Sequence, residues 1–239
     1  MPSSGPLLLY IETSTDLCSV ALSIGSRLID EKISRESRAH ARVIAPMTLE
    51  ILKDSGYTID NCDAVVVSGG PGSYTGLRVG VSLAKGLCYG SGKPLISVGS
   101  VELLANIAFK VLLPQYPGTT AIIPAMDARR MEIYTATYSS NMEMISPVKA
   151  LVVDNRSFTE ILDKGITLFC GDGALKLMEV IDHPNARFIS LEALSNGMID
   201  IALRKFQAGE FEDTAMYEPL YLKDFIAGVT KRGPLNFEK

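Results

Sequence analysis

Residues 64–80 read AVVVSGGPGSYTGLRVG, and this stretch decides the fold. It begins with a short β-branched run, Ala64 to Ser68, which is typical of a strand that is covered on both faces. A glycine-rich turn follows, and a helix is expected from about Gly76 to Tyr89. A strand, a glycine loop and a helix in this order indicate an α/β protein.

The same alternation extends to both sides of this stretch. Upstream, the pattern predicts strands at Leu7–Glu12, Leu17–Ile24 and Arg27–Ile33, then a helix at Arg38–Asp54. Downstream, it predicts a strand at Leu95–Val98 and a helix at Val101–Leu113. A hairpin that leads into helix-separated strands predicts a mixed sheet flanked by helices.

The second half of the chain partly repeats this order. A boundary is expected at Leu113–Gly118, which holds two prolines and a glycine. Beyond it, the pattern predicts strands at Ala121–Met126, Glu132–Tyr138 and Ile166–Cys170, then helices at Ala174–Ile181 and Leu194–Gln207. We therefore expect two related lobes, residues 1–113 and 114–239, each a mixed sheet flanked by helices. The helix near residues 194–207 can pack back on the first lobe.

Composition excludes several classes of protein. The 239 residues are 47% apolar and 21% charged, so the chain has enough apolar material for a folded core. The net charge of −4 argues against a surface that binds nucleic acid everywhere, although a local basic patch remains open. No apolar run is long enough to span a membrane, and no leader is recognisable, so a cytoplasmic protein is expected. The four cysteines are isolated in apolar segments and are expected to be buried thiols.

The glycine loop offers an anion site, but it fits no standard nucleotide motif. Gly76 is followed by Leu77 and Arg78 rather than by Lys and Ser or Thr, so a Walker A loop is excluded. The loop can simply cap the helix through Ser73 or Thr75, or it can contact a ligand. The hairpin loop Glu12–Thr15 is comparable to the phosphate loop of two-lobed ATPases, but Ser14 stands where a glycine would help. The candidate anion contacts are Glu12, Ser14, Gly72 and Ser73.

Two helices of the first lobe are more apolar than one sheet requires. On a helical wheel, the apolar residues of 38–54 and 76–89 cover more than half of each circumference. Gly76, Gly80 and Ala84, four residues apart, predict a shallow groove that another helix could enter. Either a partner protein or the second lobe covers this surface. The candidate partner-binding residues are Val43, Ile44, Met47, Ile51, Gly76, Val79, Gly80, Leu83, Ala84 and Leu87. Gly80→Arg and Ile51→Asp are accordingly expected to abolish partner binding without unfolding the chain.

The sequence shows no recognisable catalytic or metal-binding motif. His40 and His183 are far apart and belong to no H-x-x-x-H pattern, and no Cys–His or Ser–His motif is present. The segment Asp127–Glu132 contains Arg129 and Arg130 between acids. It is either a salt-bridged hairpin turn or a holder for phosphate or a partner's carboxylate.

Several of these stretches closely resemble one family. They are Leu8–Thr15, the helix at His40–Leu52 with Pro46-Met47, Gly70–Gly80, Met126–Arg130, Gly171-Asp172-Gly173 and Glu218–Leu222. They are similar to the TsaB family, also called YeaZ, from about residue 7 to residue 223. The block Gly-Pro-Gly-Ser-Tyr-Thr-Gly is the most specific of them.

The resemblance implies a two-lobed fold of the actin-like ATPase (ASKHA) class. It implies a non-catalytic subunit that supports a metal-dependent paralogue, TsaD, in forming N6-threonylcarbamoyladenosine at position 37 of tRNAs reading codons that start with A. It also implies an ATPase partner, TsaE, and self-association through the same helical surface. The subunit would need no cofactor or metal of its own, although ATP or ADP could sit at the joint with TsaD, and tRNA would be met through the complex. The alternative is a stand-alone nucleotide-dependent transferase or a protease-like hydrolase.

Overall fold

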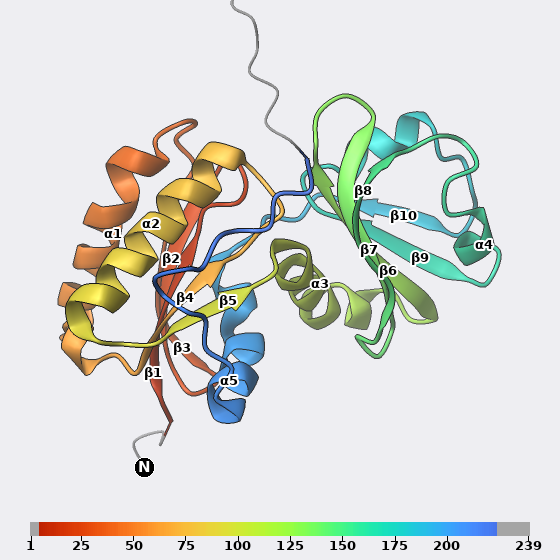
Figure 1. The fold of residues 1–239 in the computed structure, drawn as a ribbon. Helices are drawn as coiled ribbons and strands as arrows, with labels where there is room; N and C mark the ends of the chain where they lie inside the picture. The colour runs from red at the N-terminus through yellow and green to blue at the C-terminus, as the bar shows by residue number, and fades with distance from the viewer. Residues whose placement is uncertain (1–4, 224–239) are drawn as a thin grey trace, which may run out of the picture.

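The computed structural model of the chain describes residues 5–223, which form two five-stranded sheets (Figure 1). The first sheet has the order β3-β2-β1-β4-β5 and the second the order β10-β9-β6-β7-β8. The strands of the first sheet are β1 (Leu7–Glu12), β2 (Cys18–Ile24), β3 (Arg27–Ser34), β4 (Ala64–Ser68) and β5 (Leu95–Val98). Those of the second are β6 (Thr119–Asp127), β7 (Glu132–Ser139), β8 (Met144–Val152), β9 (Ile166–Cys170) and β10 (Ala186–Ile189).

The two sheets repeat one topology. In each, the first strand pairs antiparallel with the second, the second pairs antiparallel with the third, and the later strands join parallel on the other side of the first. Both sheets are therefore mixed, and the duplicated order confirms the two-lobed actin-like fold. The division at residues 113 and 114 stays a prediction.

The helices are α1 (His40–Asp54), α2 (Tyr74–Ser91), α3 (Ser100–Val111), α4 (Thr159–Leu162) and α5 (Ile199–Ala208). The four longer ones lie on the first sheet or between the two sheets, and the short α4 packs on β9 of the second sheet. Figure 1 shows α1 and α2 side by side on one face, with α3 between the two lobes. Helix α5 packs on β5, where Lys205 Nζ donates to the carbonyl oxygen of Ser97 at 2.8 Å.

Alternation along β1 explains this layering. Leu7, Leu9 and Ile11 point into a core with α1 and α2. Leu8 and Tyr10 point to the opposite side, into a core that includes α3, α5 and strands of the second lobe. Because successive side chains of a strand face opposite ways, the six buried residues of β1 support both cores at once. The second lobe thus covers the face of the first sheet opposite to α1 and α2.

Some local predictions were wrong. Strands β8 and β10 were not predicted, because both are edge strands and β8 contains Pro147, which an unpaired edge tolerates. The predicted helix at Ala174–Ile181 is a 3₁₀ segment, Leu175–Glu179. The late helix begins with a 3₁₀ turn, Ser195–Met198, before α5.

The cysteine prediction is confirmed, since Cys18, Cys62, Cys88 and Cys170 are buried free thiols. Burial raises the pKa of Cys18, Cys62 and Cys88 to about 11. Among residues 5–223, no helix combines the length and apolar character that crossing a bilayer requires.

Candidate functional site

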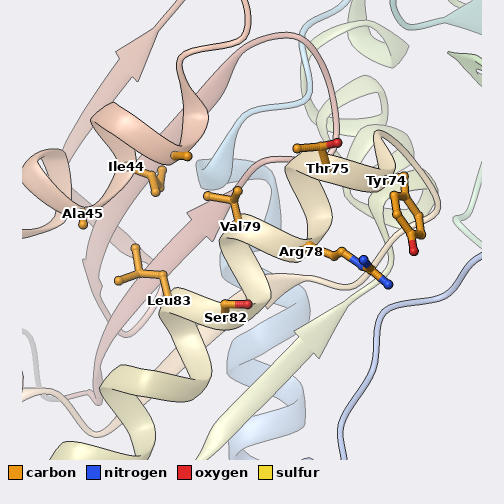
Figure 2. Close-up of a pocket in the computed structure, with 9 residues that line it drawn as sticks. Ile44, Ala45, Tyr74, Thr75, Arg78, Val79, Ser82 and Leu83 are labelled. Atoms are coloured by element: carbon orange, nitrogen blue, oxygen red, sulfur yellow. The ribbon is translucent and has the colours of Figure 1, made fainter. Parts of the chain in front are cut away.

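An open groove runs between α1 and α2 on the outer side of the first lobe (Figure 2). Its volume is about 500 Å³, and it is lined by Ala41, Ile44, Ala45, Tyr74, Thr75, Arg78, Val79, Ser82 and Leu83. Ser73 caps α2 by accepting a hydrogen bond from the backbone N–H of Gly76 at 3.3 Å. In Figure 2, Val79 and Leu83 of α2 point towards α1, while Tyr74 and Arg78 lie at one end of the groove.

The predicted partner-binding residues divide into two groups by exposure. Half-buried residues that reach the outer surface are Val43, Met47, Val79, Leu83 and Leu87. Buried residues are Ile44, Ile51, Gly76, Gly80 and Ala84. Two exposed residues were not among the predicted ones: Leu49, which is 67% exposed on α1, and Tyr89, which is 90% exposed on α2. Arg78 and Ser82, which were not among the predicted partner-binding residues, also line the groove.

The glycines of α2 do not form the expected open groove. A Cβ at Gly76 would overlap the carbonyl oxygen of Thr13, and one at Gly80 would overlap the Thr13 hydroxyl. These glycines therefore allow the β1–β2 loop, not another protein, to approach the helix closely. The expectation for Gly80→Arg and Ile51→Asp is corrected accordingly: both positions are inside the lobe, so both changes would disturb the fold itself.

The candidate anion site is occupied by the protein's own groups. The backbone N–H and the hydroxyl of Ser14 both donate to Glu12 Oε1. The N–H of Ser73 donates to the carbonyl oxygen of Ser14 at 2.7 Å, and Gly72 lies against that same carbonyl. Donors that a phosphate would need are thus already used, which favours the capping interpretation of the glycine loop over ligand contact.

Glu12 itself is fully buried where the two lobes meet. Its Oε2 has no hydrogen-bond partner within the described part of the chain. Burial raises the pKa of the Glu12 carboxyl, and the charge of Asp172 in the second lobe raises it further, against hydrogen bonds from Ser14 and Ser68. Burial likewise raises the pKa of Asp172. A carboxyl in this setting favours its neutral form.

Glu12→Gln is expected to flatten the dependence of stability on pH. The folded pKa of Glu12 lies above its ordinary value of 4.5, so the folded state holds this proton where the unfolded state has lost it. The contribution of Glu12 to the free energy of unfolding is fully present below pH 4.5 and is lost as the pH rises through the raised pKa. Urea unfolding from about pH 4 to about pH 8 measures it: the wild type should lose more stability than the glutamine variant. Glu160→Gln, at an exposed site on α4, is the control and should follow the wild type.

The turn between β6 and β7 is held by lysines rather than by its arginines. Lys176 Nζ pairs with Asp127 and donates to the carbonyl oxygens of Arg130 and Glu132 at 2.8 and 2.7 Å. Lys223 pairs with Glu132. The flanking acids therefore form salt bridges, as one interpretation predicted, but Arg129 and Arg130 take no part in them.

A C-terminal segment joins this turn to α2. We call residues 212–223 the strap. Lys85 of α2 donates to the carbonyl oxygens of Ala215 and Tyr217 at 3.1 and 2.9 Å. Further along, the ring of Tyr221 lies 4.9 Å from that of Tyr74, between centroids. Figure 1 shows the strap passing from the first sheet to the second lobe.

Among residues 5–223, no group of three or more His, Cys, Asp and Glu side chains is placed to hold a metal ion. His40 is the first residue of α1, and its Nε2 lies 2.9 Å from the carbonyl oxygen of Thr15. It thus fixes the β1–β2 loop to the helix.

Comparison with known proteins gives a consistent set of relatives. A family model described as TsaD, tRNA N6-adenosine threonylcarbamoyltransferase, matches residues 30–225. The tRNA threonylcarbamoyladenosine biosynthesis protein TsaB of Escherichia coli is 28% identical over 230 residues, which are 92% of this chain and 96% of that protein. TsaB of Haemophilus influenzae is 37% identical over 128 residues, 53% of this chain and 51% of that one. The structure of YeaZ from Pseudomonas aeruginosa superposes with a TM-score of 0.79 at 25% identity, covering 91% of this chain and 100% of that one.

Proposed function

This chain belongs to the TsaD family of tRNA N6-adenosine threonylcarbamoyltransferases, and from its TsaB relatives we propose that it takes part in forming N6-threonylcarbamoyladenosine in tRNA as a non-catalytic subunit. In this proposal, the groove between α1 and α2 binds a TsaD-type partner, which carries out the transfer. The observation that carries the proposal is the uncovered apolar face of these two helices.

The energetics of the groove support a protein partner. Covering a Leu-sized side chain is worth roughly 1.5–3 kcal/mol when it goes from fully exposed to buried, and half-buried residues contribute a part of this. Leu49 and Tyr89 extend the apolar surface beyond the groove on both helices. The second lobe lies on the opposite face of the sheet and leaves this surface open, which favours a partner over internal packing.

The contacts at the candidate anion site favour an accessory subunit over an enzyme that uses a nucleotide. Ser14 and Ser73, which would contact a phosphate, already donate to groups of the protein. The Glu12 side chain, which is longer than that of an aspartate, accepts two hydrogen bonds from Ser14 of the adjoining loop. ATP or ADP, if used by the complex, is therefore proposed to be held mainly by the partner side of the joint.

A second copy of the chain can use the same groove. An apolar face shared between self-association and partner binding makes the two events exclusive, so a homodimer would dissociate as the partner binds. A TsaE-type ATPase is proposed to bind the assembled complex, and tRNA is its substrate.

Mixing the chain with a TsaD-type partner tests the proposal. We expect one copy of each protein to elute together in size-exclusion chromatography with light scattering. The mixture, supplied with TsaE and threonylcarbamoyl-adenylate, should produce modified adenosine that mass spectrometry detects. The chain alone should show no turnover with ATP and Mg²⁺. Turnover by the chain alone would instead support the stand-alone transferase or hydrolase.

A further inference from the structure

The groove between α1 and α2 changes in character along its length. Its middle is lined mainly by apolar side chains, among them Ile44 of α1 and Val79 and Leu83 of α2. One end carries Arg78, whose side chain is exposed (Figure 2). Among residues 5–223, no carboxylate forms an ion pair with this arginine. The groove is therefore complementary to an apolar segment that carries a negative charge at one end.

The guanidinium of Arg78 is held by aromatic neighbours. It lies 4.1 Å from the centre of the Tyr74 ring, and the Tyr74 ring packs on that of Tyr221. Interaction with Tyr221 is the main cause that raises the pKa of Arg78, and the charge of Glu218 adds least. An arginine side chain that is already ordered loses less conformational entropy when a partner pairs with it. Arg78 is thus prepared for binding.

The strap is tied to the first lobe on both sides of Glu218, and this fixes the place of Tyr221. The N–H of Leu220 donates to the carbonyl oxygen of Gly69 at 2.8 Å, next to the glycine loop that precedes α2. Earlier in the strap, the Tyr217 hydroxyl lies 2.5 Å from Ser97 Oγ. The end of the groove is therefore built by two segments that are distant in the sequence, the start of α2 and the strap.

We propose that Arg78 pairs with a carboxylate of the TsaD-type partner, beside the apolar segment of that partner that fills the groove, and that Tyr221 positions Arg78 for this pairing. The inference rests on the proposed function, which assigns the groove to that partner. A planar guanidinium binds a carboxylate through two parallel hydrogen bonds, so its orientation matters. Arginine and tyrosine are also enriched among the residues that carry most of the binding energy at protein interfaces.

Isothermal titration calorimetry with the purified TsaD-type partner tests the two roles together. Arg78→Ala should weaken binding about 30-fold and Tyr221→Ala about tenfold. Because Tyr221 acts through Arg78, the double variant should also bind about 30-fold more weakly, whereas independent contacts would give about 300-fold. Arg156→Ala removes an exposed arginine of the second lobe and is the matched control, which should keep the wild-type affinity.

Salt dependence identifies the kind of group that Arg78 meets. Between about 50 mM and about 500 mM salt, the wild type should lose about threefold more affinity than Arg78→Ala, because salt screens a charge pair. Both single variants should keep the wild-type Tm within about 2 °C, since Arg78 is exposed and Tyr221 lies half-buried in the strap.

Four results would overturn the inference. They are wild-type affinity in Arg78→Ala, equal salt dependence in both proteins, a double variant that loses about 300-fold, and loss of self-association in light scattering at unchanged partner affinity. The third would make Tyr221 a separate contact, and the fourth would assign Arg78 to a second copy of the chain. A partner that does not bind the wild type at all would overturn the proposed function as well, so the two failures are distinguishable.

Discussion

Ser82→Arg is expected to weaken binding of the TsaD-type partner at least about 100-fold, which corresponds to about 2.7 kcal/mol. Ser82 is exposed and lines the groove from α2, so an arginine there adds bulk and charge where the partner must fit. A charge that is buried in an apolar interface without a counter-charge is costly, and the added volume prevents close packing. Isothermal titration calorimetry with the purified partner measures the loss.

The position makes this test cleaner than substitutions in the lobe's interior. The Ser82 side chain is no part of the core, so the variant should keep the wild-type Tm. Ser190→Arg adds the same side chain at an exposed serine after β10 and is the matched control. If the groove also joins two copies of the chain, Ser82→Arg should be monomeric in light scattering. Wild-type affinity in Ser82→Arg would show that the partner binds elsewhere.

The architecture could be predicted because its signals are local. The buried run of β4, the hairpin of β2 and β3 and the glycine turn before α2 each appear within about ten residues. The excess of apolar residues on α1 and α2 correctly indicated more surface than one sheet covers. The pattern did not show which of these side chains face the sheet and which face outward. Ile44 and Ile51 face the sheet, whereas Leu49 faces outward.

The site could be predicted less well, because its contacts join distant parts of the chain. Tyr74 and Arg78 meet Tyr221 of the strap, and no periodicity connects these positions. The pairing of Lys176 with Asp127 likewise depends on how β6 and the segment after β9 come together. The small residues at 76, 80 and 84 did predict that another segment approaches α2 closely. The sequence could not say that the neighbour is Thr13 of the same lobe.

Gly76→Ala and Gly86→Ala, the same change at two positions of α2, are expected to shift stability in opposite directions. At Gly76, a Cβ would overlap the backbone carbonyl oxygen of Thr13, and a backbone atom in a sheet-anchored loop cannot rotate away. Overpacking of this kind costs roughly 1–3 kcal/mol, and we expect the upper end of that range. At Gly86, no atom lies within 4 Å of the added Cβ, and the backbone is helical. Alanine there should add up to about 1 kcal/mol, because it is the better helix former.

Urea unfolding of both variants at one pH measures the difference, and the wild type lies between them. The pair controls for helix propensity, since both changes add one methyl group to the same helix. The loss at Gly76 therefore reports the contact between α2 and the β1–β2 loop that holds Glu12 and Ser14. Gly76→Ala should also disturb the surface of α2, so its partner affinity should fall with its stability, whereas Ser82→Arg loses affinity alone. A Gly76→Ala variant as stable as Gly86→Ala would mean that the loop does not rest on α2. The glycines would then be free to form the outward groove that their spacing suggests.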